Sequence, residues 1–62
     1  MDLKYYMDKR IRVYYIAKNG MPIFHNGVID RIGIRFLFLQ SLSGKEYIFH
    51  IPINSIKEIK LI

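Results

Sequence analysis

The sequence predicts an all-β fold, a small five-stranded barrel with a short N-terminal helical lead. Three observations support this prediction. β-Branched and aromatic residues form short runs between Gly-containing turns, Gly27 stands inside one run, and Pro52 interrupts the last apolar stretch. Such runs suit a pleated sheet, an internal glycine permits a sharp bend, and closure of the sheet removes its exposed edges.

Length and composition limit the kind of protein. The 62 residues allow one domain over 1–62, and the absence of cysteine excludes disulfides and thiolate metal sites. A hydrophobic content of 52% is far above that of a disordered chain. The apolar runs are too short to span a bilayer and no secretory leader pattern is visible, so we expect a cytoplasmic protein that does not bind membranes.

The first half of the chain predicts a lead and two strands. Asp2 is placed to cap a helical turn within 1–8. A strand follows over 9–17, and the Gly-bearing segment 18–20 turns the chain into a second strand over 23–31. Side chains alternate between the two faces of the first strand. The inner face should carry Ile11, Val13 and Tyr15, and the outer face Arg10, Arg12 and Tyr14.

The second half predicts a corner at 31–33, a strand over 34–42, a turn at 43–45 and a strand over 46–51. The third strand is apolar on both faces, with Ile34, Phe36 and Phe38 opposite Leu37 and Leu39, so both faces should be covered. Pro52 ends the fourth strand and 53–55 forms a 3₁₀ corner. Residues 56–61 then return as a fifth strand, or as a helix, since Ser55 and Glu58 have capping-box spacing.

With its lead, strands and turns in this order, the chain resembles the Sm/LSm superfamily, including its Hfq branch, over about residues 3–59. The segments that carry the resemblance are "RVYYI", "GVID", "FLFLQSLSGK" and "YIFHIPINSI". A generic SH3 domain shares the last segment and remains the alternative, although the absence of tryptophan argues against a peptide-binding SH3 domain.

The resemblance implies a ring in which the fourth strand of one subunit pairs with the fifth of the next, and RNA bases that stack near two loops. The matching loop positions are Arg31, Ile32, Gly33, Ile34 and Arg35, followed by His50, Ile51 and Pro52. The Asp and Asn of the common Sm loop have no match here, and the Tyr-Lys-His of the Hfq type is reduced to Phe49-His50.

Basic and aromatic residues interleave near the N-terminus, and the net charge is +5. Cations track phosphates and flat rings stack on bases, so this pattern favours single-stranded nucleic acid. Lys9, Arg10, Arg12 and Tyr14 are the first candidate site, with Tyr5 and Tyr6 as further platforms. The alternative is a solvated strand face whose tyrosines complete the core or a subunit contact.

Arg31 and Arg35 form a second candidate site, and His50 is a further, separate candidate. Two guanidiniums at one corner can hold phosphate, although Asp30 and Glu46 can equally neutralise them. His50 can bind a base, but it and His25 also suit structural roles. No nucleophile–base pair, metal-ligand spacing or Gly-rich phosphate loop is present, so we expect no enzyme activity, metal or cofactor.

The function expected is therefore non-catalytic binding of single-stranded RNA, with DNA as a second choice, by a homo-oligomer. Ile48, Leu37, Leu39 and Ile62 are candidates for the subunit contact because apolar residues exceed what one small interior holds. The alternative function is a protein-binding adaptor or inhibitor, from a phage or mobile element, that contacts a host protein.

Overall fold

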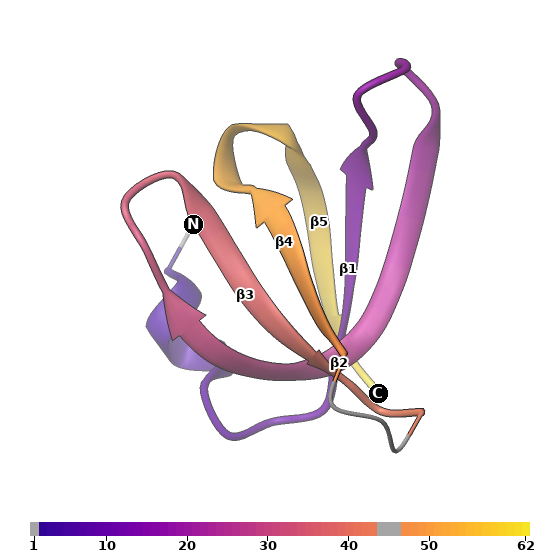
Figure 1. Ribbon diagram of the computed structural model, residues 1–62. Helices are drawn as coiled ribbons and strands as arrows, with labels where there is room; N and C mark the ends of the chain where they lie inside the picture. The colour runs from indigo at the N-terminus through magenta and orange to yellow at the C-terminus, as the bar shows by residue number, and fades with distance from the viewer. Residues whose placement is uncertain (1, 44–46) are drawn as a thin grey trace.

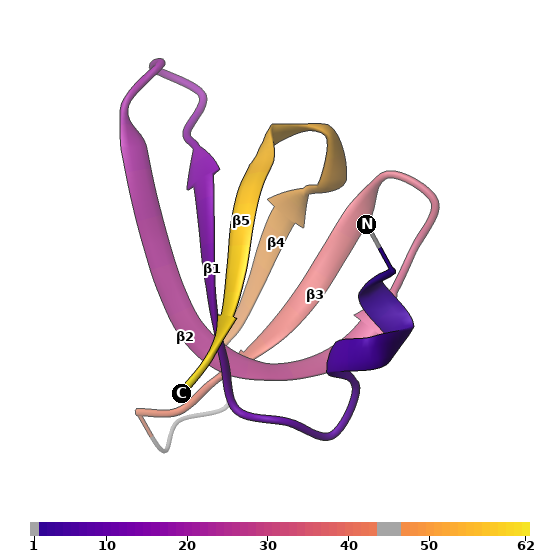
Figure 2. The ribbon, with the colours of Figure 1, turned by 180° about the vertical axis from the view of Figure 1, so that it is seen from behind.

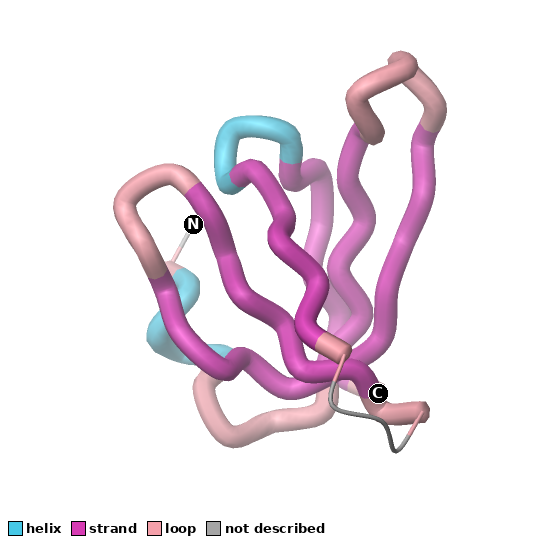
Figure 3. Tube along the Cα trace, viewed as in Figure 1, coloured by secondary structure: helices cyan, strands magenta, loops and turns pink. Residues whose placement is uncertain are grey.

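The protein forms one antiparallel five-stranded sheet with two short 3₁₀ helices, as seen in a computed structural model that describes residues 2–43 and 47–62. Figure 1 shows the strands and Figure 3 the helical turns. The elements in chain order are η1 (Leu3–Tyr6), β1 (Ile11–Ile16), β2 (Pro22–Ile32), β3 (Phe36–Ser41), β4 (Ile48–Pro52), η2 (Ile53–Ser55) and β5 (Ile56–Leu61). The all-β prediction is confirmed, and so is the 3₁₀ corner before the last strand.

The strands lie in the order β4-β3-β2-β1-β5, so β4 and β5 are the two edges. The 11-residue β2 pairs with β1 through its first half and with β3 through its second half. Because β2 bends, the sheet folds into two layers: β3 and β4 lie in front in Figure 1, and β5 lies in front of β4 in Figure 2.

The core fills the space between these layers. Its members come from every strand: Ile11, Val13, Tyr15, Ile29, Leu37, Leu39, Ile51 and Ile56. Alternation along β1 is confirmed, because its residues are buried at every second position. Leu37 and Leu39 are fully buried, so the prediction that they contact another subunit is wrong. Phe36 on the opposite face is 41% exposed, so within the chain only the Leu37 side of β3 is fully covered.

A bulge at Asp30 shifts the register between β2 and β3. Ile29 is paired with Leu39, whereas Arg31 is paired with Phe38. An extra residue in one strand reverses the side-chain alternation beyond it. Arg31 therefore lies on the outer face, although it stands two residues after the buried Ile29.

A second register shift separates Tyr14–Glu58 from Tyr15–Ile56, which leaves Lys57 as the extra residue of β5. It explains the three-residue spacing of Ile56 and Ile59: Ile56 is buried and Ile59 packs against the core from the same strand. Residues 56–61 are thus a strand, and the helix alternative is excluded.

The β1–β2 connection is the Gly-bearing hairpin turn that the sequence predicts. The Gly20 N–H donates to the Ala17 carbonyl over 2.8 Å, and Gly20 has φ +85°, which is unfavourable for side-chain-bearing residues. The Asn19 side chain accepts the Met21 N–H over 3.1 Å. Pro22 is the first residue of β2, as expected for a residue without an N–H.

The β2–β3 corner lies two residues later than predicted. β2 continues to Ile32 and β3 begins at Phe36, with the Gly33 N–H donating to the Phe36 carbonyl over 2.8 Å. Ile34 is 98% exposed, so its predicted place in the third strand is wrong. The cause is the Asp30 bulge, which lengthens β2. The predicted turn at 43–45 and the strand start at 46 fall mostly outside the described residues.

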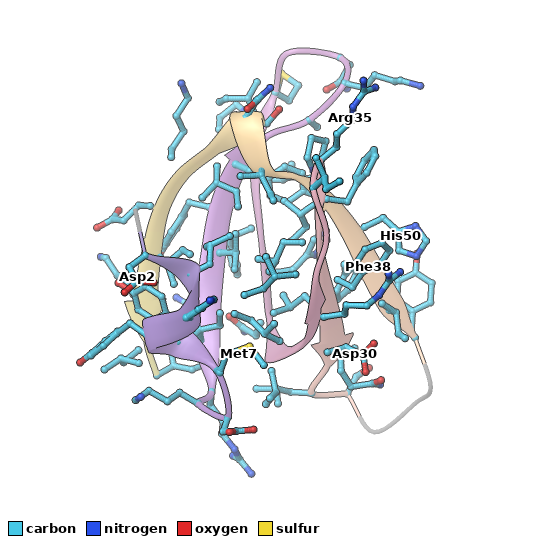
Figure 4. All side chains as sticks on the ribbon, turned by 90° about the vertical axis from the view of Figure 1, so that its left-hand side faces the viewer. Asp2, Met7, Asp30, Arg35, Phe38 and His50 are labelled. Carbon is cyan, nitrogen blue, oxygen red and sulfur yellow. The ribbon has the colours of Figure 1, made fainter. Side chains whose placement is uncertain are left out.

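The N-terminal lead is a single 3₁₀ turn. The Asp2 carboxylate accepts the Lys4 N–H over 3.1 Å, which confirms the predicted cap. Leu3, Tyr6 and Met7 pack against the core, and Met7 lies at the lower end of the space between the layers (Figure 4). In the described part of the chain, neither helix is long and apolar enough to cross a membrane.

Gly27 is the point at which β2 passes from one layer to the other. It is paired with Ile11 of β1 and with Ser41 of β3. A methyl group added at Gly27 would overlap the carbonyl oxygen of Gln40 and lie 2.8 Å from Leu39 Cγ. The predicted role of this glycine, a bend with close approach of a neighbouring strand, is confirmed.

We expect Gly27→Ala to lower the free energy of unfolding by about 1–3 kcal/mol, because the backbone of Gln40 cannot move without disturbing β3. Urea denaturation followed by circular dichroism measures this loss. Gly33→Ala is the matched control, with a smaller loss, because its nearest neighbours would lie at 3.1 Å and 3.2 Å. Equal midpoints for Gly27→Ala and the unchanged protein would contradict this role.

Candidate nucleic-acid interface

The outer face of β5, β1 and β2 carries two cross-strand rows of polar and aromatic side chains. In the first row, Arg12 is paired with Lys60 on one side and Asn26 on the other. In the second, Tyr14 is paired with Glu58 and Phe24. We call these six residues the β1 outer face. Adjacent strands bring side chains from distant parts of the sequence within contact distance.

Arg12 is held over this face by two interactions. Its Nε donates to the Asn26 side-chain oxygen over 2.8 Å, and its guanidinium lies 4.7 Å from the centre of the Phe24 ring. Among the described residues the hydrogen bond uses only Nε, so the terminal nitrogens keep donors for an anion. A positioned guanidinium loses less entropy when it binds phosphate than a free one.

Tyr14 and Phe24 form the aromatic centre of the face. Their ring centres are 5.6 Å apart, and Phe24 is 49% exposed. Lys60 Nζ lies 5.6 Å from the centre of the Tyr14 ring. The face therefore combines an accessible ring with two cations, Arg12 and Lys60, against one carboxylate, Glu58.

A second group lies on the outer face of β2, β3 and β4. The Arg31 guanidinium is 4.2 Å from the centre of the Phe38 ring, and the His50 ring meets Phe38 edge-on at 4.9 Å. Figure 4 shows Phe38 and His50 side by side on the outer side of this layer. The bulge at Asp30 makes this group possible, because it turns Arg31 outward.

The predicted site residues therefore do not form one cluster. Arg12 and Tyr14 lie on the β1 outer face, whereas Arg31 and His50 meet at Phe38 on the other layer. Arg35 is exposed in the β2–β3 corner, where its carbonyl accepts the Ile53 N–H over 2.9 Å. Arg31 lies over Phe38 and Arg35 in the corner itself, and their joint binding of phosphate stays a prediction.

Lys9 and Arg10 precede β1 and are exposed. Lys9 Nζ donates to the Tyr5 carbonyl over 2.8 Å and lies 4.6 Å from the centre of the Tyr5 ring. The Arg10 carbonyl accepts the Ile62 N–H over 3.0 Å. Tyr6 packs against the core and so serves the structure rather than an open platform.

Sequence reasoning missed Phe24, Asn26 and Lys60 as members of the site. Phe24 and Asn26 could have been found from the hairpin: a turn centred on Asn19 places Tyr14 opposite Phe24 and Arg12 opposite Asn26. Lys60 had no such local signal, because its pairing with Arg12 depends on the return of β5 to β1 and on the Lys57 bulge.

A separate aromatic cluster lies at one end of the core. The His25 ring stacks on Phe49 with centres 3.6 Å apart and planes 7° apart, and Tyr15 and Tyr47 complete the cluster. A shallow surface recess of about 400 Å³ lies beside it, lined in part by His25, Asn26 and Phe49. Burial lowers the pKa of His25, and burial together with the nearby Tyr47 raises the pKa of Tyr15.

The arrangement suits binding through rings and cations. Within residues 2–43 and 47–62, no group of three or more His, Cys, Asp or Glu side chains is placed to hold a metal ion. Comparison of the chain with family models, with curated proteins and with solved structures gives no match.

Folding stability should fall as the pH drops below about 6.5, the ordinary pKa of histidine, because the lowered pKa of His25 means that the unfolded chain binds a proton more readily. The contribution of His25 to the free energy of unfolding is fully present above the ordinary histidine pKa. It is lost as the pH falls toward the lower pKa that His25 has in the folded protein. Urea midpoints between pH 8 and pH 5 measure it, before carboxylates titrate at about 4.

His25→Phe keeps a ring against Phe49 and should flatten this pH dependence. His50→Gln is the control and should retain it, because His50 is exposed. If lowering the pH from 8 to 5 destabilises His25→Phe as much as the unchanged protein, another group is responsible for the pH dependence.

Proposed function

We propose that the protein is a small barrel of the SH3-like or Sm-like kind that binds single-stranded nucleic acid without catalysis. RNA is the first choice of ligand and DNA the second. The observation that carries the proposal is the β1 outer face, where Arg12 lies over the Phe24 ring and Lys60 over the Tyr14 ring.

The barrel form is supported by the course of the sheet. β2 bends through both layers, and η2 joins the two edge strands β4 and β5 by a single 3₁₀ turn. A core built from all strands lies between the layers. The order of strands also agrees with the resemblance to Sm/LSm proteins.

Binding would proceed by electrostatic capture followed by stacking. A net charge of +5 raises the local concentration of a polyanion and increases its rate of association. Arg12 and Lys60 then neutralise phosphates, while a base stacks on the exposed ring of Phe24 or on the half-buried ring of Tyr14. Every base has a flat face, so this mode tolerates many sequences.

A fluorescent single-stranded RNA should bind with an affinity that falls steeply as salt increases. Lys60→Gln should reduce the slope of log affinity against log salt by about 0.7, the value for one phosphate contact in a single strand. Phe24→Leu should weaken binding by about 1–3 kcal/mol through lost stacking. Fluorescence anisotropy at several salt concentrations measures both.

Lys4→Gln on η1 is the matched control for charge, because it also removes one exposed cation but lies outside the β1 outer face. Its effect should be small. Affinity that is independent of salt, or equal loss in Lys4→Gln and Lys60→Gln, would contradict the proposed interface.

We further propose that the protein acts as a homo-oligomer. The edge strands β4 and β5 each pair on one side only, and unpaired strand edges readily add another strand. On the outer face of β3 and β4, Phe38 and Ile48 would extend such a contact. The Sm/LSm resemblance implies the same pairing of fourth and fifth strands.

Light scattering should therefore give a mass that is a multiple of the 7.4 kDa chain. Ile48→Lys should shift the population toward the monomer, because Ile48 lies on edge strand β4 and a charge there would be buried in the contact. Met21→Lys, at an exposed loop position, is the control. If the unchanged protein is a monomer at all concentrations, the proposed homo-oligomer is wrong.

The second candidate function is a protein-binding adaptor or inhibitor. The observation that favours it is the apolar β3–β4 outer face beside Ile34, which is 98% exposed at the adjoining corner. Exposed apolar groups of this kind commonly mark protein contacts. Absence of oligonucleotide binding together with a stoichiometric host protein in a pull-down would favour this function.

A further inference from the structure

A groove of about 600 Å³ lies between the end of β1 and the end of β4. Pairing explains its position: Tyr15 is opposite Ile56, so the preceding Ser55 of η2 lies near Ile16, while Pro52 at the end of β4 is opposite Phe36. The β1–β2 turn thus forms one wall and the β4–η2 corner the other. The groove is separate from the β1 outer face.

The walls offer flat and apolar surfaces. Phe36, Pro52 and the His50 ring line one side and Tyr15 the other. Phe36 is 41% exposed, so its ring is accessible from the groove. Sites for small planar ligands combine such rings with a few polar groups.

The polar groups favour an anion. Lys18 is an exposed cation on the rim, and among the described residues the groove lining contains no acidic side chain. Ser55 and His50 can supply hydrogen bonds.

The groove begins at the end of the strand that carries the proposed interface. Tyr14 belongs to the β1 outer face, and Lys18 on the groove rim follows it by four residues, just after β1 ends at Ile16. A strand bound to the β1 outer face would therefore pass the end of β1 to place a nucleotide in the groove.

We propose that the groove takes one nucleotide of the bound strand, with its base against Phe36, His50 and Pro52 and its phosphate at Lys18. This inference rests on the proposed function and deepens it: the β1 outer face captures any strand, and the groove selects among bases by its shape and hydrogen-bond donors. Lys18, Phe36 and Ser55 are the residues it adds to the site.

Two variants test the groove through RNA affinity. Phe36→Leu keeps an apolar side chain but removes the flat ring, and should weaken binding about 5- to 150-fold. Lys18→Gln should lower the salt slope by about 0.7. Lys4→Gln and Met21→Leu are the matched controls, and thermal unfolding checks that each variant is folded. RNA binding that is retained in both groove variants overturns this inference and leaves the proposed function intact.

Direct titration separates the two proposals. The four nucleoside 5′-monophosphates are added to ¹⁵N-labelled protein, and the amide signals of Ala17, Lys18 and Ser55 should shift, by different amounts for different bases. If the protein binds no oligonucleotide, the proposed function fails, and these shifts alone decide the groove. Unchanged signals, or shifts only with a short proline-rich peptide, overturn the nucleotide pocket.

Discussion

The close approach of Gly27 to the backbone of β3 is the constraint on which the other features depend. Gly27 is paired with both Ile11 and Ser41, so the sheet changes layers at this residue. A side chain there would meet the Gln40 carbonyl and hold β3 away. Without this approach the two layers could not enclose one core, and in 62 residues there is no second place to bury apolar side chains.

Two bulges then determine which residues reach the surface. The extra residue Asp30 turns Arg31 outward onto Phe38, and the extra residue Lys57 lets Ile56 and Ile59 face the core together. Both departures from strict alternation are small in backbone terms. Their effect on function is large, because they decide which cations lie beside rings and are accessible to a polyanion.

Much of the fold could be predicted because its signals are local. The turn at Asn19-Gly20, the strand alternation of β1 and the corner after Pro52 follow from backbone chemistry over a few residues. The errors arise where pairing partners decide. Ile34 lies in a corner because the Asp30 bulge lengthens β2, and the apolar run of β3 does not reveal which of its faces the chain itself covers.

The sequence by itself determined the all-β class, the succession of strands and turns along the chain, the capped lead and the presence of basic and aromatic side chains. It named Arg12 and Tyr14, since charge and ring type are properties of single residues. Only the tertiary structure decided that Phe24 and Lys60 join them, that Arg31 lies over Phe38, and that a groove opens beside Pro52. These arrangements depend on register between strands distant in sequence, and register follows from the packing of the whole core rather than from any local pattern.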